Sequence, residues 1–134
     1  MGIQTDWDNE AHTIIRRTYG ETLNIDEMLE TLPVVQEMVA GESHVVHMVH
    51  CFPERVRIPR DLLFTLHRLQ GAMPENTGLS VLVGGGTTAR AMIALLRRLV
   101  PPIGRRLRLA ASIEDARVVI AEAQYNRAAD PASR

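Results

Sequence analysis

Residues 79–99 have the pattern of one complete strand, turn and helix from a parallel β-sheet protein. The run Ser80-Val81-Leu82-Val83 is short and apolar, as in a strand that is buried on both faces. Three glycines follow, and apolar residues then recur at the spacing of one helix face: Ala89, Met92, Ile93, Leu96 and Leu99. Because a strand followed directly by an amphipathic helix predicts a β-α-β crossover, the chain is expected to fold in the α/β class.

The segments around this unit continue the alternation of strands and helices. The expected elements are a hairpin of residues 3–7 and 12–19, a helix after Asn24, a strand over 44–52, a helix after Pro59, a strand around 107–109 and a helix after Ser112. Pro33 lies inside the first helical pattern and predicts either a kink or a division into two helices. Together these elements predict a mixed sheet with an antiparallel N-terminal hairpin and parallel later strands, flanked by four helices.

Length and composition predict one soluble domain. A chain of 134 residues with 46% hydrophobic content can bury one sizeable core, which we expect over residues 1–125, with a flexible tail over 126–134. No charged-then-apolar leader and no stretch of about 20 apolar residues is seen. The single cysteine, Cys51, cannot form an intrachain disulfide, which fits a reducing compartment. We therefore expect a cytoplasmic location without a membrane span.

The order of elements and two short motifs resemble a known family. Gly20-x-x-Leu23 leads from the predicted hairpin into the first helix, and Ser112-Ile113-Glu114-Asp115-Ala116 opens the last one. This pattern, over residues 3–124, resembles the STAS domain and, more closely, the SpoIIAA-like STAS/SEC14 group of small bacterial proteins. The resemblance implies a mixed sheet with surrounding helices and, as in anti-sigma factor antagonists, a regulatory role through a partner protein.

The loop of residues 51–59 departs from that family. In phosphorylatable STAS antagonists this loop carries a serine or threonine at the start of the next helix, whereas here it contains neither. The resemblance therefore implies the fold and a non-catalytic regulatory or protein-interaction role, without a phosphorylation switch. A homodimer or a protein partner is expected.

The glycine turn is the best candidate for a ligand site. Gly84-x-Gly86-x-x-Ala89 has the dinucleotide-binding spacing, and Thr87 or Thr88 is placed to cap the helix. The acidic residue that would hold a ribose is missing, since Ala110-Ala111-Ser112 stands there, so no nucleotide cofactor is expected. Two interpretations remain open, a purely structural turn and a site for a small anion. The residues of the anion site would be Gly85, Gly86, Thr87, Thr88 and Arg90.

Charge is divided unevenly along the chain. Residues 1–83 carry 6 Arg against 12 acids and residues 84–134 carry 9 Arg against 4 acids, although the total is −1. All 15 basic residues are arginine, which excludes a P-loop lysine and a Schiff-base lysine. The small net charge argues against general nucleic-acid binding. A group of five arginines offers either a solvated surface or a second anion site: Arg97, Arg98, Arg105, Arg106 and Arg108.

The histidines do not form a predicted metal or catalytic site. In the run His44-x-x-His47-x-x-His50-Cys51, a strand places His44 and His50 on one face and His47 on the other, so the three cannot converge on a metal. His50 and Cys51, as neighbours in a strand, likewise point to opposite faces and cannot form a nucleophile and base. No metal, cofactor or catalytic set is therefore predicted, and the expected function is binding.

Overall fold

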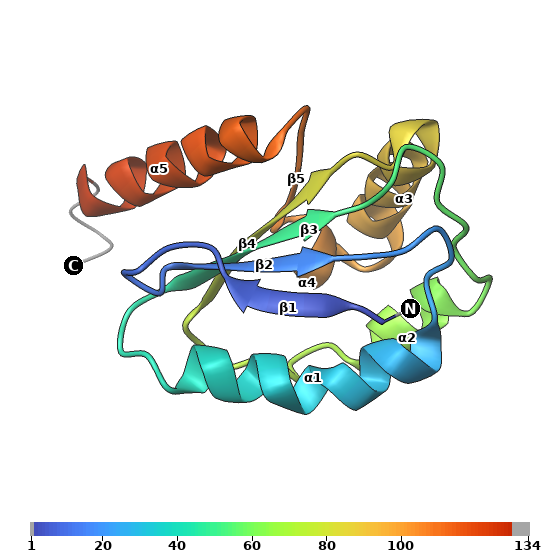
Figure 1. The fold of residues 1–134 in the computed structure, drawn as a ribbon, viewed down its shortest axis with the longest axis horizontal. Helices are drawn as coiled ribbons and strands as arrows, with labels where there is room; N and C mark the ends of the chain where they lie inside the picture. The colour runs from blue at the N-terminus through green and yellow to red at the C-terminus, as the bar shows by residue number, and fades with distance from the viewer. Residues whose placement is uncertain (1, 130–134) are drawn as a thin grey trace.

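A five-stranded mixed sheet forms the centre of the protein in a computed structural model that describes residues 2–129 (Figure 1). The strands are β1 (Gln4–Trp7), β2 (Ile14–Thr18), β3 (Val46–Cys51), β4 (Thr77–Val83) and β5 (Leu107–Ala110). They lie in the order β1-β2-β3-β4-β5, with β1 antiparallel to β2 and every later pair parallel. The predicted α/β class and mixed sheet are confirmed.

Five helices connect and follow the strands, one more than the sequence predicts. They are α1 (Ile25–Ala40), α2 (Leu62–Arg68), α3 (Gly86–Leu99), α4 (Pro101–Gly104) and α5 (Ile113–Ala129). Parallel strands joined in sequential order by right-handed crossovers place the connecting helices on one face of the sheet. The last helix, α5, follows β5 and connects no strands, and it lies on the opposite side of the sheet from α1 (Figure 1).

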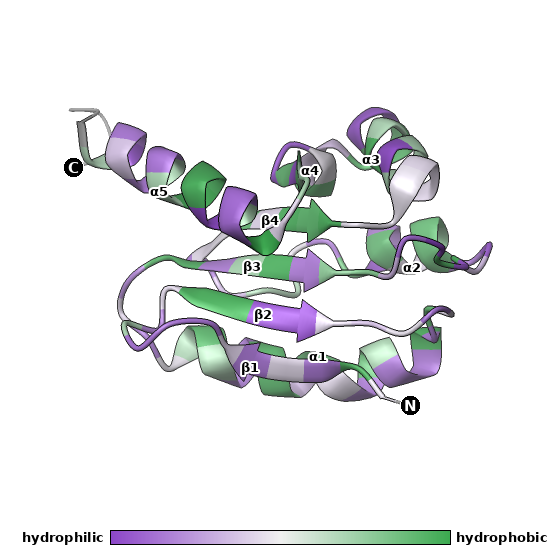
Figure 2. Cartoon of the chain, turned by 45° about the horizontal axis from the view of Figure 1, so that its top comes forward, coloured by the Kyte–Doolittle hydropathy of each residue, from purple (hydrophilic) through white to green (hydrophobic). Residues whose placement is uncertain are grey.

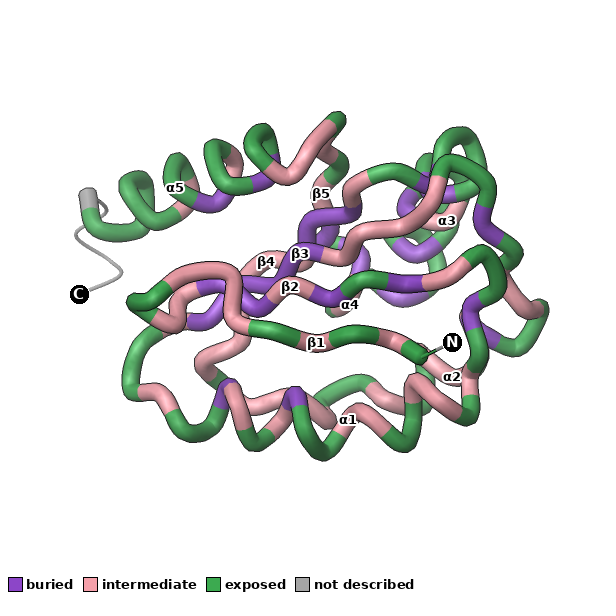
Figure 3. The backbone as a smooth tube through the Cα atoms, in the orientation of Figure 1, coloured by how far each residue is buried: buried purple, intermediate pink, exposed green. Residues whose placement is uncertain are grey.

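The core is divided between these two faces. Alternate strand residues, among them Ile15 and Met48, pack against Val35 and Val39 of α1. The intervening strand residues, among them Val49 and Val81, pack against α5. The buried residues concentrate in the central strands and on the inner sides of the helices (Figure 3). The central strands β3 and β4 therefore contribute buried side chains to both faces of the sheet, as is typical of parallel strands between helices.

Two predicted helix starts are confirmed by their caps. The Asn24 side chain accepts a hydrogen bond from the Glu27 amide at 3.0 Å, and the Ser112 hydroxyl accepts one from the Asp115 amide at 3.1 Å. Each cap satisfies an amide that has no partner within its helix.

Pro33 neither divides α1 nor ends it, because the helix is continuous over 16 residues. The residue lies on the exposed side of the helix. There a carbonyl that loses its intrahelical donor can bond to water, so one helix tolerates the proline.

The N-cap of α3 and the burial of its last residue differ from the sequence prediction. The cap residue is Gly85, in the left-handed conformation, so Thr87 and Thr88 lie inside the first turn and cap nothing. At the other end Leu99 is 55% exposed and Val100 is buried in its place. The chain turns at Val100 into the additional helix α4, whose first residue is Pro101, a position that needs no amide hydrogen.

The hairpin and the last helix are joined by an ion pair. Arg117 of α5 donates through Nε and Nη2 to the two carboxylate oxygens of Asp8, both at 2.9 Å, and Arg16 adds a longer contact of 3.4 Å. The Asp8 side chain is almost completely buried. This bidentate contact connects residues that are more than a hundred positions apart and fixes α5 over the sheet.

Helix α5 extends beyond the expected domain end at residue 125, since it continues to Ala129, and residues 130–134 lie outside the described part of the chain. Within the described residues, no helix has both the length and the apolar character needed to cross a membrane.

Candidate ligand-binding cavity

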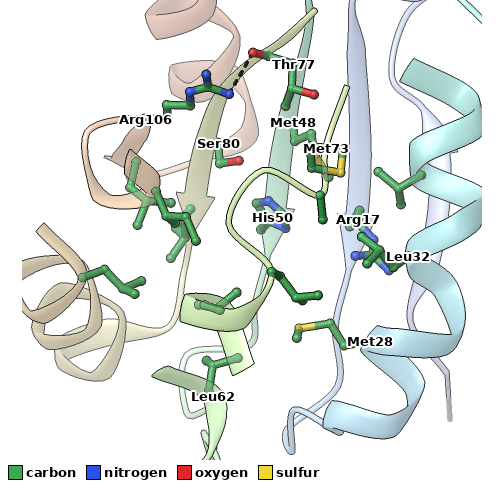
Figure 4. Close-up of a pocket in the computed structure, with 18 of the residues that line it drawn as sticks. Arg17, Met28, Leu32, Met48, His50, Leu62, Met73, Thr77, Ser80 and Arg106 are labelled. Atoms are coloured by element: carbon green, nitrogen blue, oxygen red, sulfur yellow. Dashed lines mark hydrogen bonds between the residues drawn. The ribbon is translucent and has the colours of Figure 1, made fainter. Parts of the chain in front are cut away.

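A cavity of about 580 Å³ lies between the sheet and the helices α1, α2 and α3 (Figure 4). Its lining is mainly aliphatic and sulfur-containing side chains, including Met28, Leu32, Met48, Leu62 and Met73. Both its volume and its apolar lining are those of a small-molecule site, for which about 300–1,000 Å³ is usual.

The cavity results from the shortness of α2. Helices α1 and α3 have 16 and 14 residues and cover the two sides of this sheet face, whereas α2 between them has only seven. At 1.5 Å per residue α2 is about 10 Å long and leaves much of the central strands uncovered by helix. The non-helical segment 69–76 crosses the remaining space. On β4 the residue beneath it is Ser80, which is too small to fill the gap.

The cavity opens to solvent on one side. The exposed residues of its lining belong to the segment after α2, to α4 and to the turn that follows α4: Gln70, Gly71, Glu75, Pro102 and Arg106. Arg106 donates to the carbonyl of Thr77 at 3.3 Å across this opening (Figure 4). A ligand could therefore enter between these two segments without separation of the sheet from α1.

Arg17 is the charged group deepest in the cavity wall. It is only 4% exposed and lies directly opposite His50 in the pairing of β2 with β3. Its Nε donates to the Thr5 hydroxyl at 3.2 Å and its Nη2 to the Thr31 hydroxyl at 2.6 Å. Among residues 2–129 no carboxylate forms an ion pair with it. Its positive charge is thus stabilised by two hydroxyl groups and by the Tyr19 ring, whose centre lies 5.6 Å from the guanidinium carbon.

Tyr19 and His50 form a hydrogen-bonded pair beside this guanidinium. The Tyr19 hydroxyl and His50 Nδ1 are 2.7 Å apart. Burial lowers the pKa of His50 to about 3, with a smaller contribution from the charge of Arg17, so the ring is neutral at pH 7. Burial also raises the pKa of Tyr19 to about 12, although Arg17 opposes this as a charge and hydrogen-bond donor. The tyrosine therefore keeps its proton. Because Nδ1 of His50 is the one acceptor that meets hydrogen-bond geometry with this hydroxyl among residues 2–129, we assign the proton to a bond with Nδ1, which leaves the histidine N–H on Nε2.

These polar groups come from the ends of two adjacent strands. Figure 2 shows β2 changing from hydrophobic at its start to hydrophilic at its end. Ile15, Arg17 and Tyr19 alternate along this segment, so all three face the helices α1 and α2. This alternation is the available sequence signal, since it places an arginine at a core position. None of the three polar residues Arg17, Tyr19 and His50 is among the predicted site residues.

The glycine turn, which the sequence predicts as the candidate ligand site, does not line the cavity. Gly84, Gly85 and Gly86 all have positive φ, and a side chain on Gly84 would collide with the carbonyl oxygen of Phe52. The Gly85 amide donates to the carbonyl of Pro53 at 3.1 Å. The loop after β3 therefore packs onto this turn, which explains the glycines by close backbone approach.

The five residues of the predicted anion site lie at the N-terminal end of α3, but the Gly85 amide already donates to the carbonyl of Pro53. Gly85 is buried and bonded as described, whereas Gly86, Thr87, Thr88 and Arg90 are exposed. An anion site at this turn stays a prediction.

Most arginines of the predicted group donate hydrogen bonds to backbone carbonyls. Arg97 and Arg108 donate to the carbonyl of Leu107 at 3.0 and 2.8 Å, and Arg105 donates to that of Pro101 at 3.3 Å. Together with the Arg106 contact, these bonds hold α4 and the start of β5 in place.

The histidines are separated as expected on a strand, except for His44, which precedes β3 and bonds to the carbonyl of His12 at 2.9 Å. His47 is buried on the α5 side, where its Nδ1 accepts from the Leu79 amide, whereas His50 faces the cavity. Within residues 2–129 no group of three metal-binding side chains is placed to hold an ion. Cys51 is partly exposed rather than fully buried.

No protein-family model, no curated protein and no solved structure matches this chain. The candidate function therefore depends on the geometry of the chain itself.

Proposed function

We propose that this protein binds a small, largely apolar molecule in the cavity between the sheet and α1, α2 and α3. The observation that carries the proposal is the cavity itself, whose lining is apolar and which opens to solvent beside Arg106. Side chains around a cavity have fewer packing partners than those of a filled core, and a bound apolar molecule would supply the missing contacts. The hydrophobic effect would drive its entry.

Binding without catalysis agrees with the state of the two titratable groups in the wall. The pKa of Tyr19 is raised and that of His50 is lowered, so neither group exchanges protons readily near pH 7. Their hydrogen bond to each other suits a fixed polar surface that orients a ligand.

A neutral fluorescent probe tests the proposal. N-phenyl-1-naphthylamine becomes brighter in apolar surroundings, and we expect saturable binding of one molecule per chain. Ser80→Phe places a large ring in the cavity and should abolish this signal. Ser43→Phe is the matched control, because Ser43 is exposed and does not line the cavity. Circular dichroism and a urea titration would verify that both variants fold.

Two results would contradict the proposal. One is no saturable increase in fluorescence with the native protein. The other is an equal increase in folded Ser80→Phe and Ser43→Phe, since the probe would then bind outside the cavity.

A second candidate function, self-association, is favoured by the outer face of α5. Val118, Ala121 and Tyr125 are exposed at positions i, i+3 and i+7, the spacing of a helix-pairing seam. The first turn of α5 is acidic, with Glu114 and Asp115, and the last turn is basic. An antiparallel pairing with α5 of a second copy would bring opposite charges together. This proposal agrees with the regulatory interaction role that the STAS resemblance implies.

Light scattering coupled to size-exclusion chromatography tests this second candidate. We expect a dimer of the native chain and a monomer of Tyr125→Glu, whereas Leu99→Glu, on exposed α3, should leave the dimer intact. A monomeric native protein at high concentration would refute self-association.

A further inference from the structure

We infer that the ligand carries a single anionic head group, of the carboxylate type, which binds Arg17 at the inner wall of the cavity while an apolar tail extends toward Ile103 and the opening. This inference rests on the proposed function, because it assigns a ligand class to the same cavity.

The first support is an unneutralised buried charge. Transfer of a guanidinium from water into a protein interior is costly unless a partner of opposite charge repays it. Arg17 is only 4% exposed, yet among the described residues its side chain donates hydrogen bonds only to the neutral hydroxyls of Thr5 and Thr31, and its guanidinium lies 5.6 Å from the centre of the Tyr19 ring. A ligand carboxylate would supply the missing negative charge.

The second support is the number of donors that remain. A guanidinium has five N–H groups. The Nε N–H bonds to Thr5 and one Nη2 N–H bonds to Thr31, which leaves three N–H groups for a further acceptor. A carboxylate has two oxygens in one plane and matches a pair of guanidinium donors. The hydroxyl contacts hold the guanidinium in position between α1 and the sheet.

The third support is the neighbouring histidine. Because Tyr19 donates to Nδ1 of His50, the Nε2 nitrogen carries the N–H and has no hydrogen-bond partner among the described residues. His50 lies beside Arg17 in the strand pairing and lines the same cavity. It can therefore offer one more donor to the same anion, next to the guanidinium.

The rest of the lining indicates the tail. Leu32 lies beside Arg17 in Figure 4, and Met28 and Met48 line the same space. Leu96 and Ile103 also belong to this apolar lining. One deep cation and a long apolar wall together fit an amphiphile with one charged end.

Three probes of equal chain length test the inference at pH 8: dodecanoate, dodecan-1-ol and dodecylammonium. Each is titrated against bound N-phenyl-1-naphthylamine below its aggregation concentration. For the native protein we expect dodecanoate to displace the dye at concentrations at least tenfold lower than dodecylammonium. In Arg17→Met, the ratio of the dissociation constants of dodecan-1-ol and dodecanoate should fall at least tenfold. Arg17→Lys should give an intermediate ratio, because it keeps the charge and loses the paired donors.

The outcomes separate this inference from the proposed function. Equal displacement by dodecanoate and dodecylammonium in the native protein would overturn the anionic head group, even if Arg17→Met failed to fold. An unchanged ratio in folded Arg17→Met would overturn the role of Arg17. In both cases dye binding blocked by Ser80→Phe would leave the cavity as an apolar binding site. Absence of dye binding to the native protein would instead refute the proposed function itself.

Discussion

Acidification should destabilise this protein through His50, and replacement of that residue should remove the effect. The folded protein holds the pKa of His50 at about 3, whereas an unfolded histidine has its ordinary value of 6.5. Below pH 6.5 the unfolded chain therefore binds a proton that the folded chain does not. Stability contributed by the neutral histidine is complete above pH 6.5 and is lost progressively as the pH falls toward 3.

The magnitude follows from these two values. At pH 5 the solution is about 1.5 units below the unfolded pKa, and each unit corresponds to about 1.36 kcal/mol. The expected loss in the free energy of unfolding between pH 7.5 and pH 5 is thus about 2 kcal/mol from His50 alone. Because pH 5 is still well above the folded pKa, this number depends little on its exact value.

Urea titrations at pH 7.5 and pH 5 measure the effect as a difference between variants. His50→Gln keeps an amide oxygen that can accept the Tyr19 hydroxyl proton but has no proton of its own to gain. Its loss of stability between the two pH values should be smaller than that of the native protein by about 2 kcal/mol. His67→Gln, at an exposed position on α2, should behave as the native protein does. If the free energy of unfolding of His50→Gln fell between pH 7.5 and pH 5 by an amount within about 0.5 kcal/mol of the native fall, the lowered pKa of His50 would be refuted.

Three further predictions concern stability and are all measured by urea unfolding. Gly84→Ala should cost at least about 2 kcal/mol, because φ is +81° and the new methyl group meets the Phe52 carbonyl, whereas Gly20→Ala, with open space around it, should change stability by less than about 0.5 kcal/mol. Arg117→Gln should lower the urea midpoint through loss of the bidentate contact to Asp8, and an unchanged midpoint would show that the contact does not stabilise the fold. Arg17→Met should stabilise the ligand-free protein by about 1–3 kcal/mol, because it removes a buried charge that no carboxylate neutralises; destabilisation would show that the hydroxyl contacts outweigh this cost.

Local sequence patterns were sufficient for most of the elements. Polar caps such as Asn24 and Ser112 marked helix starts correctly, because a side-chain cap depends only on residues three positions apart. The predicted burial of Leu99 is wrong, since the chain reverses at Val100 and buries this residue instead, although Leu99 satisfies the helical spacing. Such exchanges depend on how α4 packs, and helical periodicity does not contain that information.

The candidate cavity could not be derived from the same patterns. Its existence depends on the short α2, on the path of residues 69–76 and on the small side chain of Ser80, which meet only in the folded chain. Arg17 was visible as a charged residue at a core position of a strand. Whether an acid neutralises it, however, depends on which face of α1 lies above it, and there the structure places Thr31.

A comparison of the glycine turn with the cavity indicates which of the two is adapted for a ligand. Both break a local rule: the turn holds three consecutive residues at positive φ, and the cavity holds a buried charge and incomplete packing. At the turn the chain itself uses what the glycines provide. The Phe52 carbonyl fills the space beside Gly84, and the Pro53 carbonyl accepts the hydrogen bond of the Gly85 amide. At the cavity no carboxylate of the described residues neutralises the charge of Arg17. Since proteins retain uncompensated local costs chiefly where function requires them, we place the ligand in the cavity, although the turn carries the more familiar sequence motif.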